Sequence, residues 1–318
     1  MIETRDLTKR YRSVLALDRL NLKIGEGEIF GFIGPNGAGK TTTIRILSGL
    51  LRPTSGSVRV AGVDVSRHPR RARLLVGYLP DGFGVYAGMR VWEYLDFFGA
   101  AYRIPRRLRR ARIDEALALA GAEAMRDYFV DSLSRGMLQR VGLAKTLVHN
   151  PAVLLLDEPT SGLDPRARIE IRELLKRLRG AKKTLIVSSH ILPELATICD
   201  QIGIIERGRM LVCGTVGEVM RAVHQERFID IEVLGDPAAA AETLRALRPG
   251  GALKVREIVG RQIRIGYSAG DDEIARLLAD LVRAGVRVVW QSEPAPDLEQ
   301  IYMTVTDAAR AGERRVVA

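Results

Sequence analysis

The sequence predicts an α/β protein: a largely parallel sheet covered by helices, followed by a smaller α+β domain. In the front part of the chain, short apolar runs alternate with helical segments, which is typical of parallel strands joined by helices. After about residue 220 the pattern restarts in the order strand, helix, strand, strand, helix, strand, as in a ferredoxin-like sandwich. The chain has 318 residues, of which 47% are hydrophobic, so it can bury two cores of this kind.

The elements of the first domain follow from hydrophobic patterning. A helical stretch over residues 91–148 interrupts the alternation, and we expect it to form a lobe inserted into the α/β core. A helix is expected over Thr42–Leu51, where a turn with Pro53 and Gly56 ends it. Strands are expected at Ile29–Ile33, Ser57–Val60, Leu74–Leu79, Val153–Leu156, Thr184–Ser188 and Ile202–Ile205.

The second domain is expected to contain four strands and two helices, and a short helix, Asp297–Thr304, is expected after them. A hairpin around Gly260 joins the second and third strands. We therefore place the domains at residues 1–220 and 221–318. The strands are Phe228–Val233, Leu253–Val259, Gln262–Tyr267 and Val286–Trp290, and the helices are Asp236–Leu247 and Asp271–Ala284.

The net charge is +11, and the excess lies in the front part, because residues 222–318 hold 13 basic and 15 acidic side chains. A positive surface suits polyanions such as nucleotides, nucleic acids or an anionic membrane face, but a solvated helix face is the explanation that we favour. No run approaches the roughly 18–20 apolar residues that a membrane-spanning helix needs. We therefore expect a soluble chain that reaches a membrane only by docking.

The strongest motif is Gly34-Pro-Asn-Gly-Ala-Gly-Lys40-Thr41, which matches G-x-x-x-x-G-K-[ST] between an apolar strand and a helix. Glycines let backbone N–H groups turn toward phosphate oxygens, and the N-terminus of the following helix attracts the same anion. Lys40 would reach the β- and γ-phosphates, and the Thr41 hydroxyl would bind Mg²⁺. A glycine-rich turn before a helix is the simpler alternative, but the complete motif in this context favours nucleotide binding.

Two carboxylates end the buried run that starts at Val153. Strand ends of a parallel sheet open into the crevice where ligands bind. Asp157 is placed to hold Mg²⁺, and Glu158 is placed to polarise the water that attacks the γ-phosphate. His190 follows another apolar strand, so it could donate to that phosphate and sense its presence, although a lone histidine at a strand end is more often a capping or core residue.

Together these motifs resemble the ATP-binding subunit of an ABC transporter, over roughly residues 1–215. Leu133-Ser-Arg-Gly-Met137 resembles the signature sequence LSGGQ, Ser161-Gly-Leu-Asp164 resembles the D-loop, and His190 the switch histidine. Tyr11 stands where the family stacks an aromatic ring on adenine. Residues 222–318 resemble the appended domain of ABC-2 type exporter ATPases. Within them, the segment from Asp297 to Thr306 resembles the closing helix of that group. The resemblance thus implies a P-loop NTPase core of the ABC ATPase type.

Two motifs depart from the family pattern, the signature sequence at two positions and the segment before Asp81 at one. Arg135 stands where the signature usually has glycine, and Met137 where it has glutamine, a variant that is familiar in ABC-2 exporters. Asp81 stands where a glutamine usually helps to bind Mg²⁺ and to couple the site to the membrane partner. Asp81 can still offer an oxygen to Mg²⁺, but it cannot donate an amide hydrogen bond.

The resemblance implies an ATPase that uses ATP and Mg²⁺ and pairs head-to-tail with a second copy of itself or with a paralogous ATPase. Two ATP molecules would lie in that interface and drive separate permease subunits of the ABC-2 type. The chain would then sit at the cytoplasmic face of the membrane, and no nucleic-acid partner is expected. The implied catalytic residues are Glu158, His190 and Lys40, the metal ligands Thr41, Asp81 and Asp157, and the nucleotide-binding residues Tyr11, Asn36, Gly37, Ala38, Gly39, Lys40, Thr41, Thr42, Ser134 and Gly136.

Two alternatives remain at this level. One is a soluble ABC ATPase that acts on translation or DNA. The chain has a single cassette and a short segment from Thr41 to Leu133, and its arginine clusters lack interleaved aromatic residues for base stacking. The other is a regulator that binds nucleotide without hydrolysing it. Asp81 in place of the usual glutamine leaves this alternative open, whereas the presence of Glu158 argues against it. The C-terminal domain could be a regulatory or dimer-stabilising module, or a packing appendage.

Overall fold

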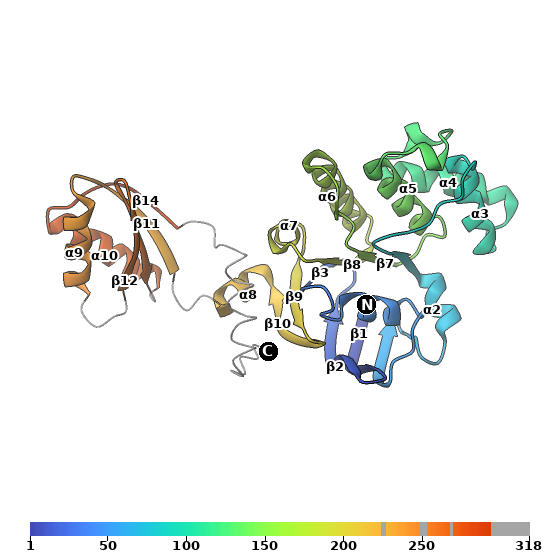
Figure 1. The fold of residues 1–318 in the computed structure, drawn as a ribbon, viewed down its shortest axis with the longest axis horizontal. Helices are drawn as coiled ribbons and strands as arrows, with labels where there is room; N and C mark the ends of the chain where they lie inside the picture. Colours follow the sequence, from blue (N-terminus) through green and yellow to red (C-terminus); the bar gives the residue numbers. More distant parts are fainter. Residues whose placement is uncertain (224–226, 249–252, 268–269, 294–318) are drawn as a thin grey trace. The chain divides into compact units, whose positions relative to one another are not determined.

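The computed structural model describes residues 1–223, 227–248, 253–267 and 270–293 (Figure 1). Their contacts divide the chain into a first unit, Met1–Val219, and a second unit that begins at Met220. Helix α8, Val216–Val223, spans this division.

The first unit is built on a six-stranded sheet with the order β10-β9-β3-β8-β7-β6. All neighbours pair in parallel except β10 and β9, which pair antiparallel. Every residue of β3, β7 and β8 is buried, so these strands form the continuous apolar runs of a sheet covered on both faces. The strands are β3 Ile29–Ile33, β6 Val76–Leu79, β7 Val153–Asp157, β8 Thr184–Ser189, β9 Gln201–Glu206 and β10 Arg209–Thr215.

Besides the helices between β6 and β7, four helices lie along the chain between the first and last strands of this sheet: α1 Lys40–Leu47, α2 Pro69–Leu75, α6 Pro165–Gly180 and α7 Leu192–Ala196. The longest, α6, starts at Asp164, whose side chain accepts a hydrogen bond from the N–H of Ala167 at 2.9 Å. Its buried residues, Ile171, Leu174, Leu175 and Leu178, recur at helical spacing along one face. The prediction of a largely parallel α/β core is confirmed.

A second, antiparallel sheet with the order β2-β1-β4-β5 was not predicted. Its strands are β1 Ile2–Tyr11, β2 Val14–Ile24, β4 Ser55–Val60 and β5 Val63–Asp64. The strand predicted at Ser57–Val60 exists, but it belongs to this sheet. The register of β1 shifts at three places, and these irregularities break the alternation by which a half-buried strand is recognised. Leu22 and Val58 of this sheet share one core cluster with Phe30 and Leu155 of the parallel sheet.

The strand predicted at Leu74–Leu79 is wrong in its first two residues. Leu74 and Leu75 are the last turn of α2, which starts with Pro69 at its first position, a residue that favours helix initiation. Val76 takes an extended conformation and starts β6. Short apolar runs do not distinguish a helix end from a strand start.

Residues between β6 and β7 form the predicted helical lobe, which consists of α3 Val91–Ala101, α4 Arg106–Ala120 and α5 Arg135–Leu147. These three helices are grouped on one side of the parallel sheet, and the antiparallel sheet lies on the other side (Figure 1). Two short 3-10 turns, Glu123–Met125 and Val130–Ser132, lead from α4 to α5. Helix α4 ends at Gly121, which has a φ of 59°, a left-handed conformation that glycine tolerates.

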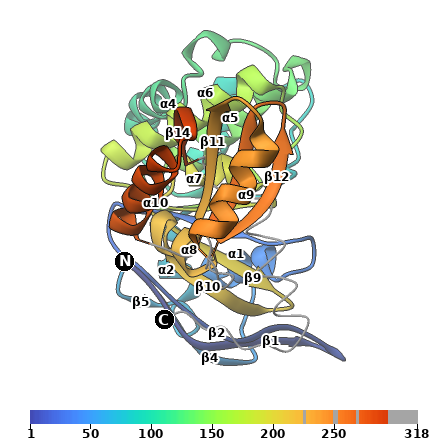
Figure 2. The same cartoon turned by 90° about the vertical axis from the view of Figure 1, so that its left-hand side faces the viewer.

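The second unit has the predicted order of elements and forms a four-stranded antiparallel sheet, β12-β13-β11-β14. Figure 2 shows α9 and α10 in front of its strands, and their apolar residues Leu244, Leu277 and Leu281 pack with Ile231 and Ile263 of the sheet. The predicted helix Asp297–Thr304 lies outside the described residues. The elements are β11 Arg227–Leu234, α9 Pro237–Leu247, β12 Leu253–Val259, β13 Gln262–Tyr267, α10 Asp271–Arg283 and β14 Arg287–Ser292.

Candidate nucleotide site

The loop from Gly34 to Thr41 connects the buried strand β3 to α1. Gly37 and Gly39 have φ angles of 81° and 115°, so the loop turns through conformations that other residues rarely adopt. A Cβ on Gly39 would lie 2.8 Å from the carbonyl oxygen of Ala16, which leaves room only for glycine. Helix α1 has no side-chain cap and no acidic residue in its first turn, so its N-terminal N–H groups and positive dipole are available to an anion.

Lys40 points from the start of α1 toward the carboxylates. Lys40 is 5% exposed, and its Nζ donates hydrogen bonds to the carbonyl oxygens of Gly34 at 2.5 Å and Pro35 at 3.3 Å. The same Nζ lies 3.4 Å from Oε1 of Glu158. The loop and the end of β7 therefore meet through this ammonium group.

Asp157 is the last residue of β7 and is 2% exposed. It is paired in register with Ser188 of β8, whose hydroxyl donates to Oδ1 of Asp157 at 2.6 Å. The same hydroxyl accepts a hydrogen bond from the N–H of Glu158 at 3.0 Å. Ser188 thus fixes both carboxylate residues, although the sequence analysis did not name it as a site residue. The available signal was its position at the end of a strand parallel to β7.

Glu158 has a φ of 50°, a left-handed conformation that turns the chain sharply at the end of the strand. Its Oε2 lies 2.9 Å from Nδ1 of His190. Its Oε1 is buried, and in the described part of the chain it has the Lys40 ammonium nearby but no hydrogen-bond donor. This oxygen is therefore poised to accept a hydrogen bond from a small molecule such as water.

The segment after Glu158 is tied to α7. Thr160 Oγ1 donates to Oε2 of Glu194 at 2.9 Å, and the other oxygen of Glu194 accepts from Arg168 of α6 at 3.0 Å. The N–H of Ser161 donates to the carbonyl oxygen of Glu158 at 3.1 Å. These bonds hold the residues that resemble the D-loop in a fixed turn between β7 and α6.

Asp157, Asp81 and Thr41 carry oxygen groups of the kind that binds a hard cation. Burial, and then the negative charges of Asp157 and Asp81, raise the pKa of the Tyr78 phenol to about 12, so both carboxylates act on one neighbouring group. Thr41 is exposed in the first turn of α1. Carboxylate and hydroxyl oxygens are the ligands that Mg²⁺ uses in proteins, usually one or two carboxylates together with water and phosphate, so these residues fit the ion.

The remaining predicted residues lie apart from this cluster. Tyr11 is 41% exposed on β1, with the Lys9 ammonium 5.0 Å from its ring centre. Ser134 caps α5, and its Oγ accepts from the N–H of Met137 at 3.3 Å. Gly136 lies against α6, because a Cβ added to it would lie 3.3 Å from Cβ of Ala167. Within the residues that the structure describes, none of these three touches Lys40 or the two carboxylates.

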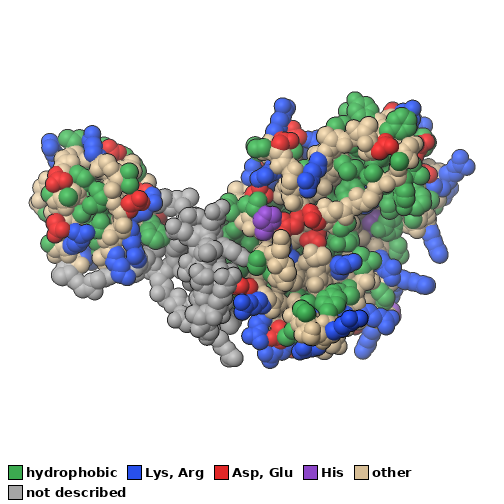
Figure 3. All heavy atoms as spheres, in the orientation of Figure 1, with side chains coloured by type: hydrophobic (Ala, Val, Ile, Leu, Met, Phe, Trp, Pro, Cys, Tyr) green, Lys and Arg blue, Asp and Glu red, His purple; other side chains and the backbone are tan. Residues whose placement is uncertain are grey.

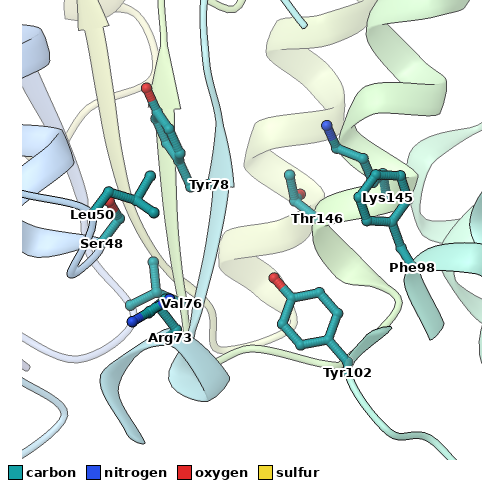
Figure 4. A pocket seen from close by; sticks show the side chains of 9 residues that line it. All are labelled: Ser48, Leu50, Arg73, Val76, Tyr78, Phe98, Tyr102, Lys145 and Thr146. Carbon is teal, nitrogen blue, oxygen red and sulfur yellow. The ribbon is translucent and has the colours of Figure 1, made fainter. Parts of the chain in front are cut away.

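A separate cavity of about 180 Å³ opens between the helical lobe and the parallel sheet. Figure 4 shows Lys145, Phe98 and Tyr102 on the side of the helices, facing Tyr78 and Leu50. The Lys145 ammonium lies 4.4 Å from the ring centre of Phe83 and 5.3 Å from that of Phe98, and burial lowers its pKa to about 8. The other lining residues are Ser48, Arg73, Val76 and Thr146.

On the face of the first unit that Figure 3 shows, the Lys and Arg side chains form several separate groups. Several arginines of the first unit have local acidic partners, as in the pairs of Arg112 with Glu115 and Arg67 with Asp64. This distribution is that of a solvated surface.

A phosphate-binding loop, a buried lysine, two carboxylates at a strand end and a histidine beside one of them define the class: the chain is a P-loop nucleoside triphosphatase. Comparison with known proteins gives the family. The ABC transporter family matches residues 17–161. The linearmycin resistance ATP-binding protein LnrL of Bacillus subtilis is 30% identical over 308 residues, which cover 96% of this chain and 98% of LnrL. The chain therefore belongs to the ATP-binding proteins of ABC transporters, and it is an ATPase.

Other relatives and solved structures agree. The bacitracin transport ATP-binding protein BcrA of Bacillus licheniformis is 40% identical over 212 residues, or 66% of this chain and 68% of BcrA. The dimeric ABC transporter cassette MJ0796 superimposes with a TM-score of 0.62 and 29% identity over 68% of this chain and 99% of that one. A post-hydrolysis dimer of the same cassette with ADP and Pi gives the same TM-score at 28% identity, over 68% and 99% of the two chains. In the part of this chain that the structure describes, no helix has the length and apolarity to cross a membrane.

Proposed function

We propose that this chain is the ATP-hydrolysing motor of an exporter, that it pairs head-to-tail around two ATP molecules, and that it drives separate permease subunits of the ABC-2 type at the cytoplasmic face of the membrane. The observation that carries the proposal is the placement of Glu158 between Lys40 and His190. The names of relatives that confer antibiotic resistance or transport bacitracin support the export direction.

Glu158 is the proposed catalytic residue, because its Oε1 can accept a hydrogen bond from the attacking water. Oε2 is held by His190, and the backbone N–H by Ser188, so the free oxygen has a fixed direction. Oriented water next to a fixed carboxylate needs little reorganisation to react.

Nucleotide binding is assigned to the loop and the first turn of α1. The N–H groups of Asn36 to Thr42 would surround the phosphates, and Lys40 would exchange its carbonyl contacts for phosphate oxygens. Mg²⁺, held by Thr41, Asp157 and Asp81, would neutralise charge on the phosphates. Tyr11 would stack on the adenine ring, and its exposed face leaves room for this contact.

His190 is proposed to contact the γ-phosphate. Its Nδ1 faces Glu158, which leaves Nε2 on the opposite edge of the ring as the group that can reach a ligand. The side chain is 51% exposed, so the ring is accessible. This arrangement makes the phosphate contact and the orientation of Glu158 depend on one side chain.

Ser134 and Gly136 are proposed to bind the nucleotide of the partner subunit, which is a second copy of this chain or a paralogous ATPase. Both lie at the start of α5, outside the Lys40 cluster of their own subunit, and this position supports a role in the site of another subunit. A two-fold pair, as in the dimeric cassette to which this chain is similar, would place each α5 start at the loop of the other copy.

The cavity beside α3 and α5 is the proposed contact for the permease. No residue of the phosphate-binding loop lines it, and exposed aromatic residues continue from it along the lobe. Tyr86 and Phe97 are 49% and 46% exposed, with ring centres 5.3 Å apart, and Phe98 lies 5.3 Å from Phe97. Exposed apolar groups beside a cavity are typical of an interaction site.

The second unit, assigned to residues 221–318, is proposed to be an accessory module that regulates the ATPase or stabilises its dimer. It has its own hydrophobic core around Ile231 and Ile263. On its open sheet face Arg264 and Asp230 form a two-pronged ion pair at 2.7 and 2.8 Å. A self-contained core with charges satisfied in place suits an appended module.

Two measurements test the proposed function. Glu158→Gln should abolish ATP hydrolysis and leave ATP binding intact, whereas Glu173→Gln, which changes an exposed glutamate of α6, should hydrolyse at the wild-type rate. A Glu158→Gln protein that turns over normally would refute the assignment. Affinity purification from detergent-solubilised membranes should also recover a multi-span protein in stoichiometric amount. Recovery with ribosomes, with nucleic acid or alone would contradict the transport role.

A further inference from the structure

Two groups of exposed arginines in the first unit have no acidic partner among the residues that the structure describes. Other exposed arginines of this unit are paired, as Arg179 is with Asp200 at 2.6 Å. The unpaired groups lie on α2 and around the start of α4. Their charges are therefore available to a group outside the chain. The α2 group consists of Arg70, Arg71 and Arg73, and the α4 group of Arg103, Arg106, Arg107 and Arg110.

Exposed leucines accompany both groups. Leu74 in the last turn of α2 is 56% exposed, and Leu108 in the first turn of α4 is 47% exposed. The only other exposed leucine among residues 1–219 is Leu50, which lines a cavity together with Arg73. A solvated helix face accounts for the charges but not for leucines at these positions. Leucines placed among unpaired arginines are typical of a surface that lies against a membrane.

The two groups lie on the two sides of the cavity of about 180 Å³ between the helical lobe and the parallel sheet. Arg73 lines this cavity from α2, and Tyr102, which directly precedes Arg103, lines it from the end of α3. Burial raises the pKa of the Tyr102 phenol and the charge of Arg73 opposes this rise, so the two side chains are near each other. Figure 4 shows them at the same end of the cavity.

A second cavity, of about 190 Å³, also has Arg73 and Leu50 among its lining residues. Arg52 lines this second cavity as well, and Lys145 lines the first. None of the residues that line either cavity is acidic. Both cavities thus offer cations and no carboxylate, which is the charge complement of a phosphate group.

We propose that the two arginine groups and their leucines form a surface that binds the anionic phosphate headgroups of a lipid bilayer. The arginines would contact lipid phosphates, and the leucines would enter the layer of headgroups. An acidic protein could pair with the same arginines, but it would not need exposed leucines beside them. The orientation rests on the proposed function, because the cavity between the two groups is the proposed contact for the permease, which lies in the membrane.

Flotation of the purified full-length chain with lipid vesicles in a density gradient tests this surface without a permease. Vesicles of phosphatidylcholine alone are compared with vesicles of an equimolar mixture of phosphatidylcholine and phosphatidylglycerol. The chain should bind the mixed vesicles and not the neutral ones. Added salt should weaken this binding, because exposed charges are screened. A chain that binds neither kind of vesicle would overturn the proposal.

A variant with Arg70→Gln, Arg71→Gln, Arg106→Gln and Arg107→Gln should bind the mixed vesicles at least about a hundredfold more weakly, since each arginine near an anionic surface contributes about fivefold. The matched control removes the same number of charges from the second unit, so that both variants have the same net charge. It should bind within a few-fold of wild type, and equal losses in both variants would overturn the proposal. The control carries glutamine in place of four exposed arginines, Arg245, Arg276, Arg283 and Arg287.

The leucines have a separate test. Leu74→Gln combined with Leu108→Gln should weaken binding several-fold at every salt concentration at which the wild type binds, because burial of apolar surface is not screened. Unchanged binding of this variant would overturn the entry of the leucines into the headgroup layer. ATP hydrolysis by each variant without vesicles should stay within about twofold of wild type, which shows that the chain is folded. Failure of the lipid surface would thus leave the assignment of the ATPase site untouched.

Discussion

Nζ of Lys40 lies 3.4 Å from Oε1 of Glu158, so the first residue of α1 and the residue after β7 form one ion pair. Both side chains are largely buried, at 6% and 13% exposed. The pair ties the Glu158 carboxylate to the phosphate-binding loop. In the proposed function, phosphate oxygens would take over the Lys40 ammonium and leave Glu158 able to act on water.

Lys40→Ala should weaken ATP binding by at least about tenfold, because charged hydrogen bonds to phosphate are among the strongest in proteins. Binding can be measured by titration with a fluorescent ATP analogue. Lys176→Ala is the matched control, since that exposed lysine pairs with Glu173 on α6. Equal affinity of the Lys40 variant and the control would contradict the phosphate-binding loop.

Ser188→Ala should lower both stability and hydrolysis. It removes the donor to the buried Asp157 carboxylate and the acceptor of the Glu158 N–H, and buried polar groups left unpaired cost about 1–3 kcal/mol each. Urea unfolding and ATPase assays measure the two effects. Ser66→Ala, at an exposed position, should change neither. A Ser188 variant that matches this control would show that the two carboxylates do not depend on the hydroxyl.

His190→Ala should lower kcat strongly and leave ATP affinity within a few-fold of wild type. The change removes the group that holds Oε2 of Glu158, whereas Lys40 and the loop still bind the phosphates. Steady-state hydrolysis and nucleotide titration separate these effects. His68→Ala, which alters an exposed residue before α2, is the control. A rise in KM at unchanged kcat would show that His190 contributes to ATP binding and not to the hydrolysis step.

These residues show what the sequence could predict. The loop, the two carboxylates and His190 follow buried apolar strands, and parallel strand ends lie at one edge of a sheet, so their meeting followed from local pattern. The role of Ser188 depends on which strands become neighbours, which no local pattern reports. Strands β1 and β2 could not be predicted, because register shifts between them and their partial burial interrupt the alternation of apolar and polar residues.

Stability should rise with pH between about 8 and 10.5 through Lys145. Burial lowers its pKa from 10.5 to about 8, so within this window the unfolded chain holds a proton that the folded chain has lost. Below pH 8 Lys145 is protonated in both the folded and the unfolded chain, so it does not make stability depend on pH. Lys145→Met should therefore be more stable than wild type at pH 7, by on the order of 2–3 kcal/mol, and this difference should vanish near pH 10.5. Urea unfolding across the range tests this, and a pH-independent difference would show that Lys145 is not desolvated in the folded state.

Asp81→Asn should raise the Mg²⁺ concentration that hydrolysis needs. Asp81 and Asp157 both act on Tyr78, so removing one negative charge weakens the field that a divalent cation meets at this edge of the sheet. We expect the half-maximal Mg²⁺ concentration at fixed ATP to rise several-fold, with kcat recovering at high Mg²⁺. Asp114→Asn, which alters a carboxylate paired with Arg126 on the helical lobe, is the control. A lower kcat at saturating Mg²⁺ with an unchanged midpoint would mean that Asp81 acts in the catalytic step and not as a ligand of the ion.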